Sequence, residues 1–177
     1  RINMLRSNIL GLIEEMNKMS KEHDLGDIDV KVDVDKFKGA YKTMAEGVNN
    51  MVFGHISVKK KAMAAFAEFG NGNFEAPIEL FPGKKRFIND TVEQVRANLK
   101  ALIADANMLA KAAVEGKLAT RADAAKHQGD FRKIVEGVNN TLDAVIGPLN
   151  VAAEYIERIS RGDIPQIITE SYNGDFN

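Results

Sequence analysis

Hydrophobic residues along this chain recur at alternating intervals of three and four positions. The first series is Ile2, Leu5, Ile9, Leu12, Met16 and Met19, and comparable series start at Tyr41, Val92 and Val135. This spacing forms the a/d seam of a coiled coil, and so narrow a stripe favours packing against partner helices. We therefore expect long helical segments, roughly 30 residues each between connectors, whose seams face a second copy. An amphipathic helix in a monomeric bundle is the alternative.

The chain also repeats itself. The sequence Ala45-Glu46-Gly47-Val48-Asn49-Asn50 is nearly restated 90 residues later as Val135-Glu136-Gly137-Val138-Asn139-Asn140, and Val92-Glu93-Gln94-Val95 is a weaker copy between them. A second marker, a glycine followed two positions later by a large apolar residue, recurs at steps of 46, 44 and 46 residues. Its four copies are Gly26 and Ile28, Gly72 and Phe74, Gly116 and Leu118, and Gly162 and Ile164. Constant spacing indicates a repeated structural unit.

Each glycine marker starts a connector that leads to the next helix. A phenylalanine follows 11 to 15 residues later, at the expected head of that helix: Phe37, Phe87, Phe131 and Phe176. Connectors of this length can run back along a helix, which would make the two helices of a unit parallel. We expect sparse apolar residues, such as Val30, Val32 and Ile78, to pin each connector to the bundle. A β-strand over residues 29–35 is a second interpretation, and Pro148 should kink or restart the fourth helix.

Composition and charge exclude several classes of function. The net charge is −1 with both signs interspersed, so no basic surface for nucleic acid is evident. Cysteine is absent, which removes thiolate metal sites and cysteine nucleophiles. No apolar run approaches the roughly 18 residues that span a bilayer. No second ligand lies at helical spacing from His23, His55 or His127, so we expect no metal site. We also expect no cofactor and no enzyme activity.

His55 is the one histidine on a seam. There it is either a satisfied boundary residue or a polar seam residue that fixes register or lets the bundle switch.

The pattern of helix, glycine-led connector and helix resembles HAMP domains, the parallel four-helix-bundle linkers of bacterial chemoreceptors and sensor histidine kinases. The stretch from Gly147-Pro148-Leu149 through Arg161-Gly162-Asp163-Ile164 to Gly174-Asp175-Phe176 is similar to one such unit, and Gly116 to Phe131 is similar to another. The usual acidic start of the second helix is Asp-Phe at Asp130 and Asp175, and becomes Lys85-Arg86-Phe87 in the second unit. Only Pro148 supplies the early proline of the family.

The resemblance implies an all-α homodimer of serial parallel four-helix bundles with extended glycine-led connectors. We expect units at residues 1–55, 56–102, 103–147 and, partially, 148–177, of which the second is the most divergent. The implied function is signal relay in the cytoplasmic portion of a membrane-associated bacterial receptor. An upstream sensor or transmembrane segment and a downstream signalling domain would lie in the same chain, and the glycines and seam residues would carry the switching.

Three alternatives remain at this point. The chain could be the linker array of a sensor histidine kinase, or an inert coiled-coil spacer. It could also be a helical small-molecule sensor, for which Tyr41, His55 and Phe66 are the only candidate pocket residues.

Overall fold

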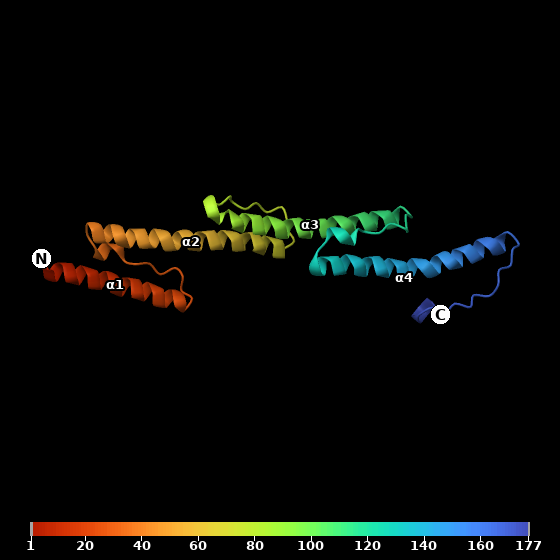
Figure 1. Cartoon of the computed structure of the whole chain (residues 1–177), viewed down its shortest axis with the longest axis horizontal. Helices are drawn as coiled ribbons and strands as arrows, with labels where there is room; N and C mark the ends of the chain where they lie inside the picture. Colours follow the sequence, from red (N-terminus) through yellow and green to blue (C-terminus); the bar gives the residue numbers. More distant parts are fainter. Residues whose placement is uncertain (1, 177) are drawn as a thin grey trace. The chain divides into compact units, whose positions relative to one another are not determined.

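The chain folds into long helices joined by extended connectors. The computed structural model describes residues 2–176. Its helices are α1 (Ile2–Asp24), α2 (Ala40–Gly70), α3 (Arg86–Val114) and α4 (Gly129–Ser160), with short 3-10 turns η1 (Val34–Lys36), η2 (Gly83–Lys85), η3 (Ala124–Lys126) and η4 (Gly174–Phe176) (Figure 1). Within residues 2–176 there is no strand. The predicted all-α class is confirmed, and the strand interpretation of residues 29–35 is wrong, because that segment has no partner with which to form a ladder.

The chain divides into two compact units, Arg1–Glu93 and Gln94–Asn177, and the boundary falls within α3. In the first unit, the connector after α1 runs back along that helix, so α2 starts beside the start of α1 and points the same way (Figure 1). In the second unit, the connector after α3 places α4 parallel to the end of α3. This is the parallel crossover that the connector length predicts.

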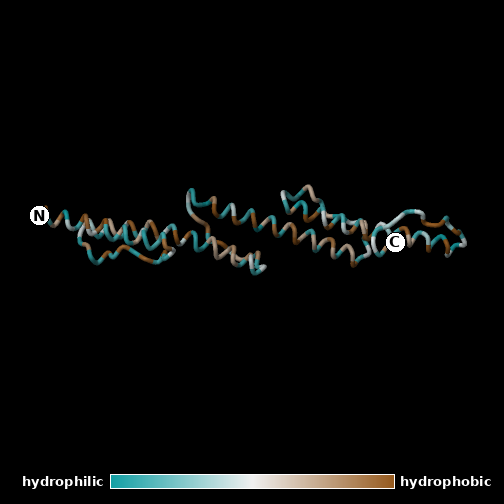
Figure 2. The backbone as a smooth tube through the Cα atoms, turned by 90° about the horizontal axis from the view of Figure 1, so that it is seen from below, coloured by the Kyte–Doolittle hydropathy of each residue, from teal (hydrophilic) through white to brown (hydrophobic). Residues whose placement is uncertain are grey.

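Each core consists of two helices and the connector that covers them. In the first unit the buried cluster is Leu12, Met19, Val32, Phe37 and Ala45, with Val48 and Val52 packed against it. In the second unit the equivalent cluster is Leu109, Ala122 and Val135, with Leu102 and Leu142 beside it. Along every helix, hydrophobic and hydrophilic positions alternate turn by turn (Figure 2). The cores are thin because much of the apolar stripe faces away from the connector.

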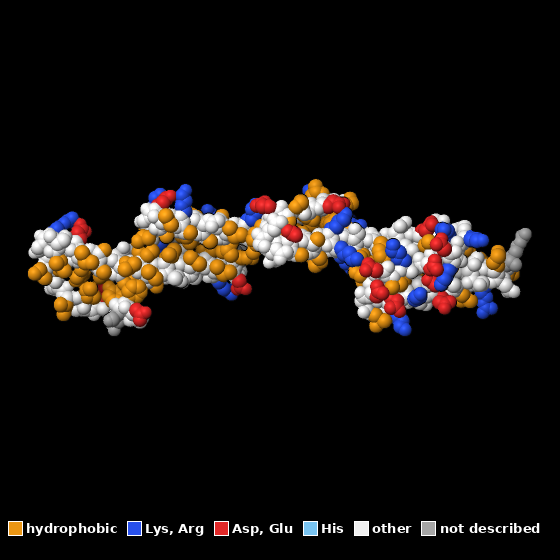
Figure 3. Space-filling model, turned by 180° about the vertical axis from the view of Figure 1, so that it is seen from behind, with side chains coloured by type: hydrophobic (Ala, Val, Ile, Leu, Met, Phe, Trp, Pro, Cys, Tyr) orange, Lys and Arg blue, Asp and Glu red, His pale blue; other side chains and the backbone are white. Residues whose placement is uncertain are grey.

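The predicted seams are only partly covered in the single chain. Leu12 and Met19 are buried, whereas Ile2, Leu5, Ile9 and Met16 of the same series are exposed. The seams of α2 and α4 show the same division, with Met44, Met51, Val138, Val145 and Leu149 exposed. In the second unit, hydrophobic side chains gather over one face of α3 and α4 (Figure 3). Every helix pair therefore keeps an apolar surface beside its own core.

α4 continues without interruption through Pro148. Of the two outcomes expected there, a kink or a restart, the restart does not occur, since Gly129–Ser160 is helical throughout. Proline lacks the N–H that would bond the carbonyl four residues earlier, so one helical hydrogen bond is missing at this point. Figure 1 shows α4 bending along its second half, which agrees with the expected kink.

Candidate functional site

The four marker glycines end the four long helices in the same way. Gly26 has a φ of 98°, a conformation that is strained for any residue with a Cβ. Its N–H bonds the His23 carbonyl at 3.0 Å, and the Asp27 N–H bonds the Glu22 carbonyl at 2.9 Å. This pair of bonds is the Schellman motif. Gly72, Gly116 and Gly162 have φ values of 81°, 72° and 81°, and in each case the glycine N–H and the N–H of the next residue donate the same two bonds to the preceding helix.

A second glycine closes each connector. Gly39, Gly83, Gly129 and Gly174 have φ values between 55° and 59° and precede or begin the next helical element. Each connector therefore lies between two glycines in the left-handed region, which reverse the chain at both ends. The four-copy glycine marker of the sequence contains only the first member of each pair.

The phenylalanines differ in their positions. Phe37 is buried in the connector three residues before α2, and not at the head of the helix, because Gly39 delays the helix start. Phe87 lies in the first turn of α3 and is exposed, and Phe131 lies in the first turn of α4 and is half-buried. Phe176 belongs to η4 and is exposed.

The first apolar residue after each marker glycine is not the deepest residue of its connector. Ile28, Leu118 and Ile164 are exposed, and Phe74 is half-buried against the Phe69 ring, with the ring centroids 5.7 Å apart. The residues that lie in the core are further along: Val32 and Phe37, Ala76 and Phe81, and Ala122 and His127.

An asparagine from the following helix holds two of these connectors by two hydrogen bonds to one residue. In the first unit, the Val32 N–H donates to Asn49 Oδ1 at 3.0 Å, and Asn49 Nδ2 donates to the Val32 carbonyl at 2.8 Å. In the second unit, Asn139 holds Ala122 with the same pair of bonds, again at 3.0 and 2.8 Å. An extended connector has no ladder partner, so this side chain satisfies backbone groups that burial would otherwise leave unpaired.

The connector between α2 and α3 is held by a related arrangement with a different register. The Phe81 N–H donates to Asn89 Oδ1 at 2.9 Å, while Asn89 Nδ2 donates to the Glu79 carbonyl at 2.8 Å. Asn89 is buried in the first turns of α3, whereas Asn49 lies about ten residues into α2. We call Asn49, Asn89 and Asn139 the asparagine clamps.

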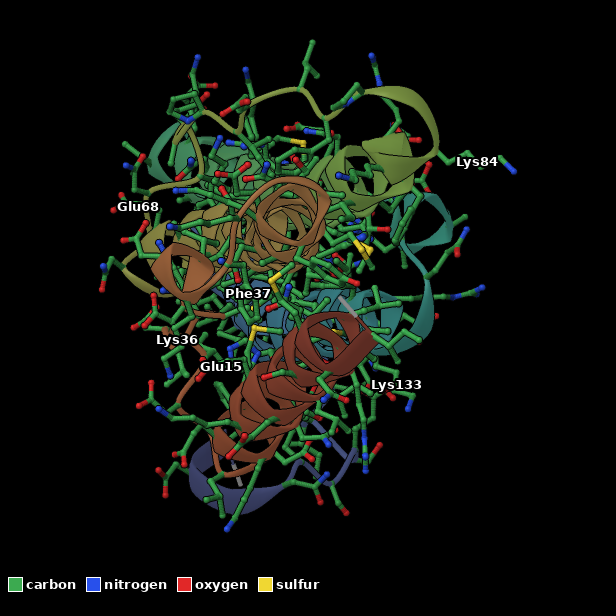
Figure 4. The ribbon with its side chains drawn as sticks, turned by 90° about the vertical axis from the view of Figure 1, so that its left-hand side faces the viewer. Glu15, Lys36, Phe37, Glu68, Lys84 and Lys133 are labelled. Carbon is green, nitrogen blue, oxygen red and sulfur yellow. The ribbon has the colours of Figure 1, made fainter. Side chains whose placement is uncertain are left out.

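Glu15 fixes the same first connector from the other helix. Its carboxylate pairs with Lys36 and accepts the Asp33 N–H at 3.3 Å, although its own side chain is only 9% exposed (Figure 4). The hydrogen bond from Lys36 lowers the pKa of Glu15 and outweighs the effect of burial, which raises it. The same bond raises the pKa of Lys36. His23 Nε2 lies 2.9 Å from the Val30 carbonyl, so α1 contacts this connector at several points.

The offset of 90 residues extends to the contacts as well as the sequence. Lys31 Nζ lies 4.7 Å from the centroid of the Phe53 ring, and 90 residues on, Arg121 pairs with Asp143 at 2.6 Å. Both pairs join the connector to the following helix next to the asparagine clamp. The chemistry differs, cation–π in one case and an ion pair in the other, but the positions match.

The last connector is held mainly at its start. Arg158 pairs with Asp163 at 2.7 Å across the Gly162 turn, which lowers the pKa of Asp163 and raises that of Arg158. Beyond the turn, Ile164, Ile167 and Ile168 are exposed.

The residues predicted for a ligand pocket or a switch do not come together in one place. His55 is exposed on α2. Tyr41, His55 and Phe66 all lie on α2, and Tyr41 and Phe66 are about 38 Å apart along the helix axis, too far to line one pocket. The residues described form no group of three or more possible metal ligands, and no described helix is long and apolar enough to cross a membrane.

Helix pairs in parallel, joined by connectors that run back between paired glycines, define a HAMP-like bundle protein, and the comparison with known families agrees. Residues 126–177 match the model described as HAMP domain, and residues 58–100 match the model described as HAMP N-terminal domain 3. The two segments together cover more than half of the chain. Both segments are therefore HAMP domains.

A particular relative is the methyl-accepting chemotaxis protein McpB of Pseudomonas aeruginosa. It is 35% identical to this chain over 107 residues, which is 60% of this chain and 16% of the relative. The chain thus spans a small part of that protein, and the match supports a HAMP region of a chemoreceptor.

Sequence reasoning did not identify the asparagine clamps as functional residues. Asn49 and Asn139 stand in the repeated motif, but their bonding partners lie 17 residues earlier, on a segment whose path the sequence does not define. One signal was present: asparagine is a poor helix former, yet it recurs in the interior of two helices at matching positions.

Proposed function

We propose that this chain is an intramolecular signal relay of a bacterial chemoreceptor. Successive HAMP bundles would pass conformational changes toward a kinase-control module elsewhere in the receptor. The observation that carries this proposal is the repetition of one docking arrangement, with the connector held by the helix before it and by an asparagine of the helix after it. Such repeats, linked by helices that each serve two connectors, are suited to transmitting a shift of one bundle to the next.

We infer that each bundle is completed by a second copy of the chain. Each helix pair buries its connector side and leaves seam residues such as Ile9, Met51 and Val138 exposed. Residues at a/d spacing pack against equivalent residues of a parallel partner, and a two-helix layer with one connector buries too little apolar surface to stand alone. The second copy supplies the two missing helices of a four-helix bundle.

The proposed units are residues 1–55, 56–102, 103–147 and 148–177, with the second the most divergent. α2 serves as second helix of one unit and first helix of the next, as do α3 and α4. In the receptor we place a sensor or transmembrane segment upstream and a signalling domain downstream, with this region on the cytoplasmic side. Changes in helix packing would be accommodated at the ends and the bend of the helices, namely at Gly26, Gly72, Gly116, Gly162 and Pro148. His55 would be a polar seam position.

Cysteine cross-linking tests the dimer without interference, because the chain contains no cysteine. Single cysteines at Ile9, Met51 or Val138 should form disulfides between equivalent positions of two copies under mild oxidation. The matched control is cysteine at Lys84, whose side chain points away from the helices (Figure 4). Equal cross-linking at Lys84 and at the seam positions, or none at either, would contradict the parallel dimer.

A deletion separates the relay from an inert spacer. Removing seven residues from α2 keeps the a/d register, so a spacer would tolerate it. A relay whose connectors dock at fixed positions should lose kinase control in the intact receptor while the chain remains helical by circular dichroism. Unchanged kinase control would favour the spacer. If the chain controls a histidine kinase domain attached to it but does not control a chemoreceptor signalling domain, the sensor-kinase alternative is favoured.

A further inference from the structure

One helix position carries a connector contact in three successive repeats. Glu15, Lys61 and Asp105 each lie eleven residues before a marker glycine, namely Gly26, Gly72 and Gly116. Each of the three side chains contacts the connector that begins at that glycine. Glu15 pairs with Lys36, Lys61 pairs with Glu79, and Asp105 Oδ2 lies 2.6 Å from His127 Nε2. At the corresponding position before Gly162 the residue is Val151.

The three contacts differ in the sign of the charge. In the first repeat the helix is acidic and the connector basic, and in the second the helix is basic and the connector acidic. In the third, the connector partner is a histidine that occupies the place of Phe37 90 residues earlier, with its side chain only 3% exposed. Lys36 lies ten residues after Gly26 and Glu79 seven residues after Gly72, so the first two connectors present opposite charges to their helices at different positions along the connector.

We propose that the residue eleven positions before each of the first three marker glycines is a latch that selects its own connector by charge. The first and third connectors have the same length between their glycines and the same clamp register, whereas the second is two residues shorter and is clamped in a different register. An opposite charge at the latch adds to this difference in shape by favouring the connector of the same repeat, and a like charge disfavours the connector of a repeat whose latch has the opposite sign. Glu15, Lys61 and Asp105 are positioning residues in this account, and the proposal does not depend on the signalling output.

A charge-reversal cycle at the second latch tests the proposal. Both Lys61 and Glu79 are exposed, so reversal does not bury an unpaired charge. The readout is hydrogen exchange of the Phe81 amide, which is protected by Asn89 and reports on docking of this connector. Lys61→Glu and Glu79→Lys should each accelerate exchange roughly twofold to fivefold, the range for an exposed ion pair. In the double variant Lys61→Glu/Glu79→Lys, more than half of the increase in the logarithm of the Phe81 exchange rate should be reversed.

The matched control is the surface pair of Arg132 and Glu136, whose side chains are 2.7 Å apart and which lies within one helix. Reversing it should leave docking of the third connector unchanged, as read from the Ala122 amide. Two results would overturn the proposal: recovery of less than half in the Lys61→Glu/Glu79→Lys variant, or an equally large effect from the control pair.

The third latch provides an independent comparison. His127→Phe introduces the residue found at the same place in the first repeat and leaves Asp105 without its partner, so the Ala122 amide should exchange faster. Asp105→Leu/His127→Phe removes both polar groups and should restore slow exchange. Equal exchange in the single and double variants would show that Asp105 does not act through His127.

Discussion

Side chains that bond to the backbone of an extended segment determine where each connector lies. Asn49 and Asn139 each satisfy the N–H and the carbonyl of one buried connector residue, so a single amide replaces the two bonds that a neighbouring strand would provide. Glu15 adds a charged acceptor from the opposite helix. These contacts are specific because a one-residue slip of the connector would break both bonds of the clamp together.

Replacing Asn139 by alanine should lower the free energy of unfolding by about 1–3 kcal/mol, because the buried Ala122 N–H and carbonyl lose their partners. The chain offers a matched control in Asn140, the exposed neighbour in the same helix. Asn140→Ala should change stability by less than about 0.5 kcal/mol. Urea unfolding of the two variants checks this, and equal losses would show that Asn139 contributes only as a helix residue.

Acid should destabilise the first connector through Glu15. The pKa of Glu15 is lowered in the folded chain by its bond from Lys36, so its contribution is present above the unfolded pKa and is lost as the pH falls through the folded pKa. Thermal melts between pH 3 and 7 should show a decrease in Tm below about pH 4.5 that is smaller in Glu15→Gln. Parallel pH profiles for the two proteins would contradict this role.

Each connector is bounded by two glycines with positive φ, so the reversal of the chain is built into its ends. Gly116→Ala should reduce stability by about 1–2 kcal/mol, since a Cβ is strained at a φ of 72°. Gly116→Asn should cost less, because asparagine tolerates this region better. Gly137→Ala, in the interior of α4 with open space at its Cβ, should instead stabilise by about 0.5–1 kcal/mol. Chemical denaturation distinguishes these cases by the sign of the change.

The elements themselves could be predicted from the sequence. Gly26, Gly72, Gly116 and Gly162 mark helix ends because few other residues adopt the Schellman turn, and the a/d series define the helices because burial follows the helical period. The connectors could be predicted as extended and running back because their length permits little else.

The contacts that dock the connectors could not be predicted in the same way. Which connector residue is buried depends on the twist between two glycines, and so Val32 and Ala122 lie deeper than the marker residues Ile28 and Leu118. The continuity of α4 through Pro148 also depends on context, since packing around the bend can offset one missing hydrogen bond. The asparagine clamps are hard to predict because they bond to backbone atoms. Every residue has these atoms, so the residue type does not show which connector residue is the partner.

At the scale of the whole molecule, the exposed seams have the largest consequence. A chain whose apolar stripes are half covered by its own connectors is expected to associate through the other half. Val138→Lys places a charge on the proposed dimer surface and should shift the mass measured by light scattering toward the monomer. Lys133→Glu, on the exposed side of the same helix, serves as the control and should leave the mass unchanged. A monomeric mass for the unmodified chain at high concentration would contradict the four-helix bundle.

The relay requires that a change in one repeat alter the packing of another. The most direct measurement is the rate of disulfide formation at Val145→Cys in the third repeat when the clamp of the first repeat is removed by Asn49→Ala. In a relay this rate should change, while Asn50→Ala, the exposed neighbouring substitution, should leave it as it was. An unchanged rate at Val145→Cys, in a chain whose first connector has been released according to hydrogen exchange at Val32, would show that the repeats behave independently.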